Sequence, residues 1–469
     1  MERRSGAKGN AEQPHMRRTQ SRESMSQRLS RVREAAKQRK KERFTALFHL
    51  LTAEALENAF LSLSRKAAAG VDGVRWKDYA ENLKVNIADL HRRLHQGSYR
   101  AQPGRRHYIP KADGKQRPLG IASLEDKIVQ YALVKILNAV YENDFMGFSY
   151  GFRPGRSQHN ALDALATGLG RTNVNWVLDA DISQFFDKVS HEWLIRFIEH
   201  RIGDQRVIRL IRKWLTAGTS EEGEWRASEE GTPQGAVISP LLANIYLHYV
   251  FDLWAHQWRR RHATGNVVMV RYADDIVIGF DKRIDAQCFR IAMQRRLKEF
   301  GLTVHPKKTR LMEFGRFAAE NRASRGKGKP ETFNFLGFTH ISGKDRSGRF
   351  MLIRKTRRDR MTATLKAIKD GLRKRWHYSI PEQGKWLRRV VQGYLNYHSV
   401  PGNYPMMRKF RIYVTDLWRR ALRRRSQQDD TTWTKANRLA AVWLPKVRVL
   451  HPWPVERFTA RHPRQEPGA

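Results

Sequence analysis

Two adjacent aspartates between two apolar runs are the strongest candidates for chemistry in this sequence. In VVMVRYADDIVIGF, residues 267–280, β-branched runs flank the pair Asp274 and Asp275. Burying an unpartnered anion is costly, so an acid beside buried strands usually has a cation or a metal as its partner. Aspartate is also a common turn residue. The segment therefore predicts a hairpin that is either a plain turn or a metal site.

A second acidic segment lies about ninety residues earlier. VNWVLDADISQFFDKV, residues 174–189, reads as an apolar strand that runs into Asp179 and Asp181 and then into a helix. If both strands belong to one antiparallel sheet, Asp181, Asp274 and Asp275 converge at one edge. Three carboxylates there suit two hard divalent ions such as Mg²⁺, and two ions can clamp the oxygens of a phosphoryl displacement. We expect Asp179 to be structural and to face the opposite side of the strand.

The elements around these acids follow a recognisable order. Residues 108–121 read as a hairpin with an Asp-Gly turn that carries Lys111 and Arg117. SYGFRPGRSQHNALDAL is a basic Gly/Pro loop that enters a helix at about Ser157, and residues 231–254 are a Gly/Pro loop followed by an apolar helix. A helix and a strand follow the acidic hairpin, and residues 333–340 read as one short strand. This order fits a split βαβ, ferredoxin-like layer.

Composition points to a polyanion as the partner. The 469 residues include 89 Lys and Arg against 46 Asp and Glu, a formal charge of +43. Such an excess is the electrostatic footprint of a nucleic-acid binder. With 13 Trp, 14 Tyr and 21 Phe, the chain has enough aromatic residues for large cores and for base stacking, unlike a generic basic packaging protein. The single cysteine, Cys288, excludes a disulfide framework. We expect no membrane span and a cytoplasmic location.

Charge also divides the chain. Residues 1–43 hold fourteen Lys and Arg against five Asp and Glu, and this arm has too few large apolar groups to form a core by itself. Residues 354–425 hold twenty-one Lys and Arg against four Asp and Glu, and their apolar residues recur at helical spacing. We predict a basic extension at 1–43, a catalytic unit at 44–345, a helical domain at 346–428 and a basic tail at 429–469.

Residues 45–425 resemble, in order, a group II intron reverse transcriptase/maturase. The motifs that carry the resemblance are IPKADGKQRPLGI, SYGFRPGRSQHNAL, DADISQFFD, TPQGAVISPLLANIYLH, YADD, FNFLGF and GYLNYH. The resemblance implies an α+β right-hand polymerase with fingers, a ferredoxin-like palm and a helical thumb/maturase domain.

The resemblance also implies roles for single residues. Asp181 and Asp274 would hold two Mg²⁺ ions with support from Asp275, and Phe186 would exclude a 2′-hydroxyl from the nucleotide site. The residues expected to contact the incoming nucleotide are Lys111, Arg117, Gln234, Gly235 and either Lys307 or Lys308, which the sequence does not separate.

Four further residues are candidates for RNA binding, each with a structural alternative. Arg153 and Arg156, in GFRPGR, either bind phosphate, which we favour, or are solvated. Tyr394 and Tyr397, in GYLNYH, either stack on RNA or belong to a core. His398 in the same motif is expected to be structural.

The implied function is RNA-directed DNA synthesis together with binding of the intron RNA, which would assist splicing and mobility. The expected partners are intron RNA, an RNA template with a DNA primer, target DNA and dNTPs, in the bacterial cytoplasm or nucleoid. Only about forty residues follow the thumb segment, so we expect no C-terminal endonuclease domain. The rival interpretations are a free-standing reverse transcriptase in defence or repair, and an RNA-binding splicing factor with a decayed polymerase site.

Overall fold

A four-stranded antiparallel sheet lies at the centre of the fold, in the order β6-β7-β3-β8. The computed structural model describes residues 24–110, 116–345, 347–425 and 431–461. The central strands are β3 (Trp176–Asp181), β6 (Val267–Tyr272), β7 (Asp275–Phe280) and β8 (Arg310–Glu313). The predicted acidic hairpin is therefore confirmed as β6 and β7, and the predicted strand before Asp181 as β3.

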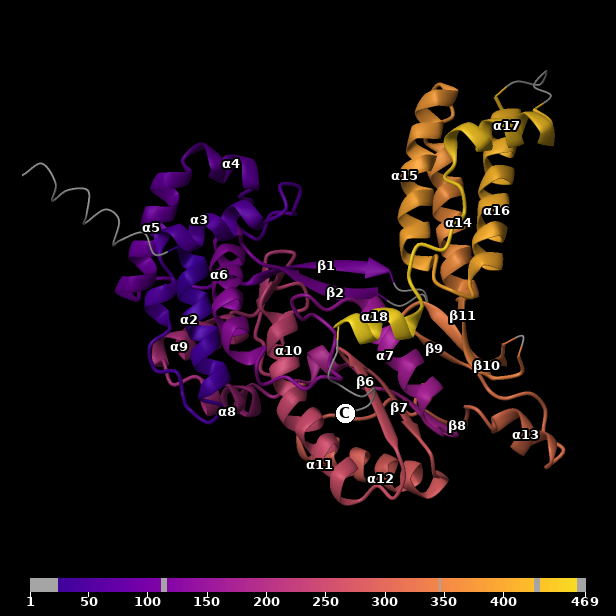
Figure 1. Ribbon diagram of the computed structural model, residues 1–469. Helices are drawn as coiled ribbons and strands as arrows, with labels where there is room; N and C mark the ends of the chain where they lie inside the picture. The colour runs from indigo at the N-terminus through magenta and orange to yellow at the C-terminus, as the bar shows by residue number, and fades with distance from the viewer. Residues whose placement is uncertain (1–23, 111–115, 346, 426–430, 462–469) are drawn as a thin grey trace, which may run out of the picture.

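Both faces of this sheet are covered, which explains why its strands are continuous apolar runs rather than alternating ones. Leu178 and Ile278 lie in the larger core, on the side of α12 (Arg283–Glu299). Val177 and Val277 lie in a second core, on the side of α7 (Gln158–Arg171). Figure 1 shows α12 and α7 on opposite sides of the strands. Helix α7 starts where the sequence predicts, because Ser157 forms a capping box with Asn160.

The N-terminal part is mainly helical and joins a second small sheet. Its helices are α2 (Met25–Gln38), η1 (Phe48–Leu50), α3 (Ala53–Ser62), α4 (Trp76–Glu81), α5 (Leu83–Gln96) and α6 (Leu124–Tyr141). The small sheet has the order β2-β1-β4-β5, from β1 (Gly104–Pro110), β2 (Gln116–Ile121), β4 (Thr219–Glu221) and β5 (Glu224–Arg226). The predicted hairpin at 108–121 is thus β1 and β2, and Lys111 lies outside the described residues.

A further group of helices completes the larger core. They are η2 (Phe185–Asp187), α8 (His191–Arg201), α9 (Gln205–Thr216), α10 (Ser239–Leu247), the π-helical turn η3 (His248–Asp252) and α11 (Leu253–Arg261). Among the described residues, every helix is too short or too polar to cross a bilayer.

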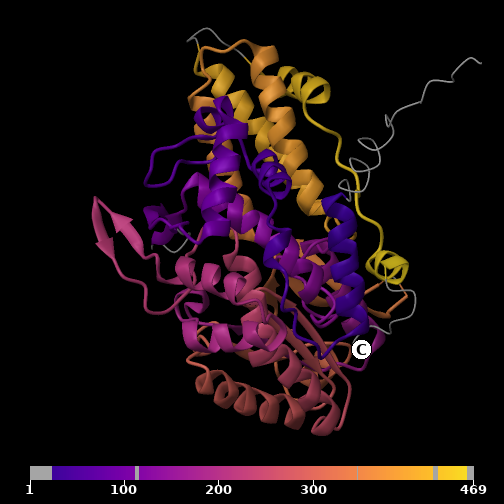
Figure 2. The same cartoon turned by 90° about the vertical axis from the view of Figure 1, so that its left-hand side faces the viewer.

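The C-terminal part is a three-stranded sheet followed by a helical bundle with its own core. It contains α13 (Ala318–Ala323), β9 (Phe333–Phe335), β10 (Phe338–Lys344), β11 (Phe350–Thr356), α14 (Arg358–Arg373), α15 (Ile380–His398), α16 (Tyr404–Arg423), α17 (Trp433–Trp443) and α18 (Pro454–Arg461). In Figure 2 the bundle, in orange and yellow, lies at one end of the molecule and α12 at the other. The segment 333–340 forms two strands rather than one, because Leu336 and Gly337 turn through positive φ.

Three features of the fold bear on the predicted organisation. Residues 25–38 of the basic arm form a helix that packs on α6 and buries Ala36, so this part of the arm belongs to the larger core. The predicted boundary between 345 and 346 separates β10 from β11, which are paired along their length. The tail does not stand apart: α17 packs on α15 and α16, while α18 packs on α7.

Buried His340 makes stability depend on pH. This β10 residue stacks on Phe333 with 4.8 Å between ring centroids, and burial, assisted by nearby Arg354, lowers its pKa to about 3. The unfolded chain takes up a proton near pH 6.5 and the native ring does not, so the free energy of unfolding should fall as pH drops below 6.5. We expect His340→Phe to remove about 2 kcal/mol of the difference between pH 7 and pH 5. Urea titrations at both pH values measure this.

The exposed residue His377 provides the control for that measurement. His377→Phe should leave the pH dependence as in the wild type. Equal pH dependence in the wild type and in His340→Phe would contradict the prediction.

Candidate active site

The two predicted acidic segments meet at one end of the central sheet. In the pairing of β3 with β7, Asp181 lies directly opposite Asp275. Asp274 precedes Asp275 in the tight turn that joins β6 to β7, where Ala273 has a φ of 56°. The tertiary structure thus brings together the three carboxylates that the sequence places about ninety residues apart.

Asp179 was expected to face away from Asp181, and this is wrong. Residues two apart in a strand point to the same face. Val177, at the start of the same alternation, lies in the second core, so Asp179 and Asp181 both face the α7 side. Burial, and to a smaller extent Asp181, raises the pKa of Asp179 to about 6, while Arg310 opposes the shift. Asp179 is therefore a fourth acid near the site.

The carboxylates at the site repel one another. Burial, followed by the charges of Asp274, Asp181 and Asp179, raises the pKa of Asp275 to about 7. Its side chain reaches solvent at the strand end, yet the surrounding protein still desolvates it. The pKa of Asp274 is also raised, by burial first and then by Asp181, and Arg117 and Lys308 act against this shift. The site carries more negative charge than its neighbours offset.

This excess of carboxylate charge suits a divalent cation that prefers oxygen ligands. Across the described ranges, however, no three His, Cys, Asp or Glu side chains are drawn together closely enough to form a ligand set. The residues therefore fit Mg²⁺ by donor type and by charge, while the side chains are not arranged as a closed metal site.

Lys308, and not Lys307, contacts the acids. Its Nζ lies 2.9 Å from Oδ2 of Asp181, and both lysine side chains are exposed. The turn at residues 306–308, just before β8, separates two residues that the sequence alone leaves equivalent. An exposed ion pair of this kind contributes little to stability.

We therefore expect Lys308→Ala to slow nucleotide addition about 10²-fold, within the range for losing a positioned proton donor. Lys307→Ala is the matched control and should stay within about twofold of the wild type, because its amine has no contact with the acids. Single-turnover extension of a primer by one nucleotide measures both. Equal losses in the two variants would show that general basicity, not the contact with Asp181, is what matters.

The loop with Gln234 and Gly235 joins the small sheet to the segment with Phe186. The backbone N–H of Gly120 in β2 donates to the carbonyl of Gln234 at 2.6 Å. The amide Nε2 of Gln234 donates to Oδ1 of Asp187 at 2.6 Å. Gly235 has a φ of 109°, and a Cβ on it would lie 3.0 Å from the carbonyl oxygen of Gly120. The loop therefore needs glycine here, and Asp187 positions the amide of Gln234.

Phe186 lies half-buried beside the acids. It belongs to η2, and its own backbone carbonyl accepts a 2.7 Å hydrogen bond from the N–H of Thr232. Its neighbour Phe185 is buried in the larger core, as expected. Gln184, just before η2, has a φ of 47°. The rings of Phe185 and Phe186 meet edge to face, with 5.3 Å between their centroids.

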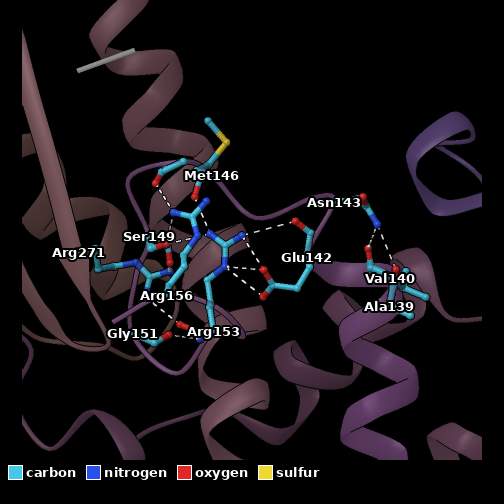
Figure 3. Close-up of polar contacts among 12 residues, drawn as sticks. Ala139, Val140, Glu142, Asn143, Met146, Ser149, Gly151, Arg153, Arg156 and Arg271 are labelled. Atoms are coloured by element: carbon cyan, nitrogen blue, oxygen red, sulfur yellow. Dashed lines mark hydrogen bonds and ion pairs between the residues drawn. The ribbon is translucent and has the colours of Figure 1, made fainter. Parts of the chain in front are cut away.

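Arg153 was expected to bind phosphate, and the structure contradicts this. Its side chain is 2% exposed and pairs with Glu142 at 3.0 Å. Its remaining N–H groups donate to the carbonyls of Met146 and Ser149, both at 2.8 Å. Figure 3 shows these acceptors surrounding the guanidinium. A buried, fully bonded arginine cannot reach a phosphate.

Arg156 is half-buried and differs from Arg153 in its partners. It donates to the carbonyls of Gly147 at 2.5 Å and Ser149 at 3.1 Å, and lies over the ring of Tyr150. Burial, followed by the charge of Arg153, lowers its pKa to about 10. Its contacts with phosphate remain a prediction.

The two tyrosines of GYLNYH are structural. Tyr394 is 8% exposed and stacks on Phe410 with 3.7 Å between ring centroids. Tyr397 donates from its hydroxyl to the carbonyl of Leu336 at 2.8 Å. His398 is buried beside the hydroxyl of Thr356. The motif thus joins α15 to the β9–β11 sheet. Burial of the ring contradicts RNA stacking by Tyr394, while stacking by the half-buried ring of Tyr397 stays a prediction.

Sequence reasoning missed a buried ion pair behind the acidic turn. Arg271 and Asp252 have 0% exposed side chains and are joined by bonds of 2.7 and 2.5 Å. The same guanidinium donates to Ser149 Oγ at 2.7 Å and to the carbonyl of Ala273 at 3.0 Å. The second contact fixes the turn that carries Asp274 (Figure 3 shows Arg271 beside Ser149). The only signal in the sequence is an arginine inside an otherwise apolar strand.

Comparison with known proteins shows which proteins the chain resembles. Residues 109–340 match the profile of the reverse transcriptase (RNA-dependent DNA polymerase) family. Protein YkfC of Escherichia coli (strain K12) is 44% identical over 206 residues, which are 43% of this chain and 54% of YkfC. The group II intron-encoded protein LtrA of Lactococcus lactis subsp. cremoris is 38% identical over 223 residues, 47% of this chain and 37% of LtrA.

A wider match is with the putative COX1/OXI3 intron 1 protein of Saccharomyces cerevisiae, 26% identical over 393 residues, 69% of this chain and 46% of that protein. The chain thus spans about half or less of the length of these relatives. Residues 109–340 form a reverse transcriptase domain. Over these residues the chain is similar to reverse transcriptases, and its relatives include proteins named as group II intron-encoded or intron proteins.

Proposed function

We propose that this chain is an RNA-directed DNA polymerase that extends a primer 3′-hydroxyl with dNTPs. The observation that carries the proposal is the pairing of Asp181 with Asp275 across two buried strands, with Asp274 in the adjoining turn. We assign the N-terminal helices with the β2-β1-β4-β5 sheet as fingers, the central sheet as a ferredoxin-like palm, and α14–α16 as thumb. The match to the reverse transcriptase family and the placement of Arg117 near the acids support this assignment.

Asp181, Asp274 and Asp275 would hold two Mg²⁺ ions. When bound, these ions supply charge for the attacking and leaving oxygens of the displaced phosphate. The protein groups do the remaining work. Arg117 and Lys308 bring positive charge to the triphosphate, as does Lys111, which lies outside the described residues. Gln234, fixed by Asp187, and Gly235 would border the nucleotide, and Phe186 would leave no room for a 2′-hydroxyl.

Primer extension on an RNA template tests this function. We expect the wild-type chain to add dNTPs when Mg²⁺ is present and to stop when EDTA is added. Absence of extension on both RNA and DNA templates, with the primer–template shown to be bound, would overturn the proposal.

We further propose that the chain binds the RNA of a group II intron and assists its splicing and mobility. Among its relatives, LtrA is named a group II intron-encoded protein, and an Arabidopsis thaliana protein that is 29% identical over 110 residues is named a nuclear intron maturase. Residues 354–425 contain twenty-one Lys and Arg and only four Asp and Glu, and this positive charge is available for RNA phosphates.

Sequencing the RNA that co-purifies with the protein from its native cell tests this second role. We expect one dominant intron-like RNA, encoded around the gene itself. A diverse set of RNAs unrelated to the locus would favour the rival interpretation, a free-standing reverse transcriptase in defence or repair.

A further inference from the structure

We propose that Phe152 is a specificity-determining residue that contacts the incoming deoxynucleotide beside Phe186. The inference rests on the proposed polymerase function and goes beyond it. Phe152 lies in the loop between α6 and α7, whose arginines were expected to bind RNA. Its ring instead faces the candidate active site.

The first observation is the position of the ring. Its centroid is 6.5 Å from that of Phe186, with the rings nearly perpendicular at 76°. It is 6.3 Å from the centroid of Tyr272, the residue two positions before Asp274. Phe152 thus connects the segment after Asp181 with the turn of the acidic hairpin. The rings of Phe152, Phe186 and Tyr272 form an aromatic cluster, and Tyr272 is paired with Asp275 in the hairpin.

The second observation is exposure. Phe152 is 48% exposed although it lies next to a core with many aromatic residues. A large apolar side chain loses about 25 cal/mol of stabilisation for each Å² that stays in water. Its open ring face is suited to packing on the flat, partly apolar surface of a sugar and base.

The third observation is backbone strain. Phe152 has a φ of 58°, a region that bulky residues rarely adopt. Among the described non-glycine residues, five have positive φ, and three of these, Phe152, Gln184 and Ala273, lie in the segments that converge here. Strained residues persist only where the surroundings hold them, and they gather at functional sites.

The surroundings of Phe152 hold it firmly. A Cβ on Gly151 would lie 2.3 Å from the backbone nitrogen of Ala273, so only glycine fits against the acidic turn. The carbonyl of Gly151 accepts a 2.7 Å hydrogen bond from Asn244. On the other side, Arg153 is anchored by Glu142 and by backbone carbonyls, as Figure 3 shows. Two buried anchors thus flank one exposed ring, and they fix its position relative to Asp274.

These anchors give Arg153 a structural role in the loop, in place of the phosphate binding that was expected of it. The guanidinium of Arg153 is fully engaged in holding the shape of the loop. The side chain that the loop presents to the site is that of Phe152. A rigid ring beside Phe186 narrows the space around the sugar from a second side. Phe152 should therefore contribute both to nucleotide binding and to discrimination against ribonucleotides.

Single-nucleotide incorporation tests this inference with the full-length chain. We expect Phe152→Ala to raise KM for a dNTP about tenfold, as for loss of one stacking contact, to leave kcat within about twofold, and to lower the preference for dNTP over rNTP. Phe152→Tyr should restore KM and the preference. Phe317→Ala, at a residue 39% exposed away from the acids, is the control and should match the wild type.

The outcomes distinguish failure of this inference from failure of the proposed polymerase function. An active wild type whose KM and sugar preference are unchanged in Phe152→Ala would overturn the inference and leave the polymerase function standing. A weakened affinity for primer–template with an unchanged KM would also overturn it, since the ring would then contact the duplex. An inactive wild type would overturn the polymerase function. The alanine variant retains the Cβ and removes an exposed ring, and thermal unfolding checks that it folds.

Discussion

Asp274→Asn is expected to abolish primer extension, with a loss of about 10³-fold or more. The substitution keeps the shape of the side chain and removes one of the charges that would hold the metal ions. A metal ion contributes several kcal/mol of transition-state stabilisation, and each 1.36 kcal/mol is a factor of ten in rate. Asp274 has no substitute, because Asp275 lies on the strand opposite Asp181 and cannot also occupy the turn.

The measurement is single-turnover extension at saturating dNTP, together with the affinity for primer–template. The affinity should stay near the wild-type value, which separates lost chemistry from lost folding. Glu320→Gln provides the control, since it removes a carboxylate that pairs with Lys344 on the surface of α13. Extension by Asp274→Asn at the wild-type rate would show that the acids at this sheet edge do not carry the reaction.

Arg271→Met is expected to lower the free energy of unfolding by about 3–5 kcal/mol, the cost of breaking a buried ion pair. Asp252 would remain charged with 0% of its side chain exposed. The carbonyl of Ala273 and the hydroxyl of Ser149 would also lose their donor. The turn with Asp274 would lose its support at the same time, so extension should fall even at temperatures where the variant is folded.

Chemical denaturation of single and double variants measures the ion pair. Arg271→Met combined with Asp252→Leu should recover much of the loss, because an apolar pair leaves no buried charge. Lys344→Met, in an ion pair whose side chains are 55% and 64% exposed, should cost about 1 kcal/mol or less. An equally small cost for Arg271→Met would mean that the pair does not hold the turn.

The arrangement of the acids explains why the opening pair of aspartates interrupts two buried strands. The strand runs are apolar on both faces because α12 and α7 cover the sheet. The acids occupy the end of the sheet where that cover stops. There the raised pKa of Asp275, about 7, reflects charges that the protein itself only partly offsets with Lys308 and Arg117. Under the proposed function, a cation and a triphosphate together would offset this charge.

The sequence by itself determined the order of the elements and the identity of the acids. The hairpin of β6 and β7, the strand that ends at Asp181 and the helix that starts after Ser157 depend on local rules: β-branched runs, turn residues and capping. The excess of basic residues indicated a nucleic-acid partner for the same reason, because composition does not depend on folding.

Only the tertiary structure decided which candidates face the site. Lys308 contacts Asp181 and Lys307 does not, and Asp179 shares the face of Asp181. Tyr394 and Tyr397 are engaged in long-range contacts with Phe410 and Leu336. Arg153 is bonded within its own loop, to Glu142 and to nearby carbonyls. Whether a tyrosine is free for a ligand depends on partners distant in sequence, and no local pattern contains that information. The sequence could therefore name the chemistry, while packing assigned each side chain either to the site or to the scaffold that holds it.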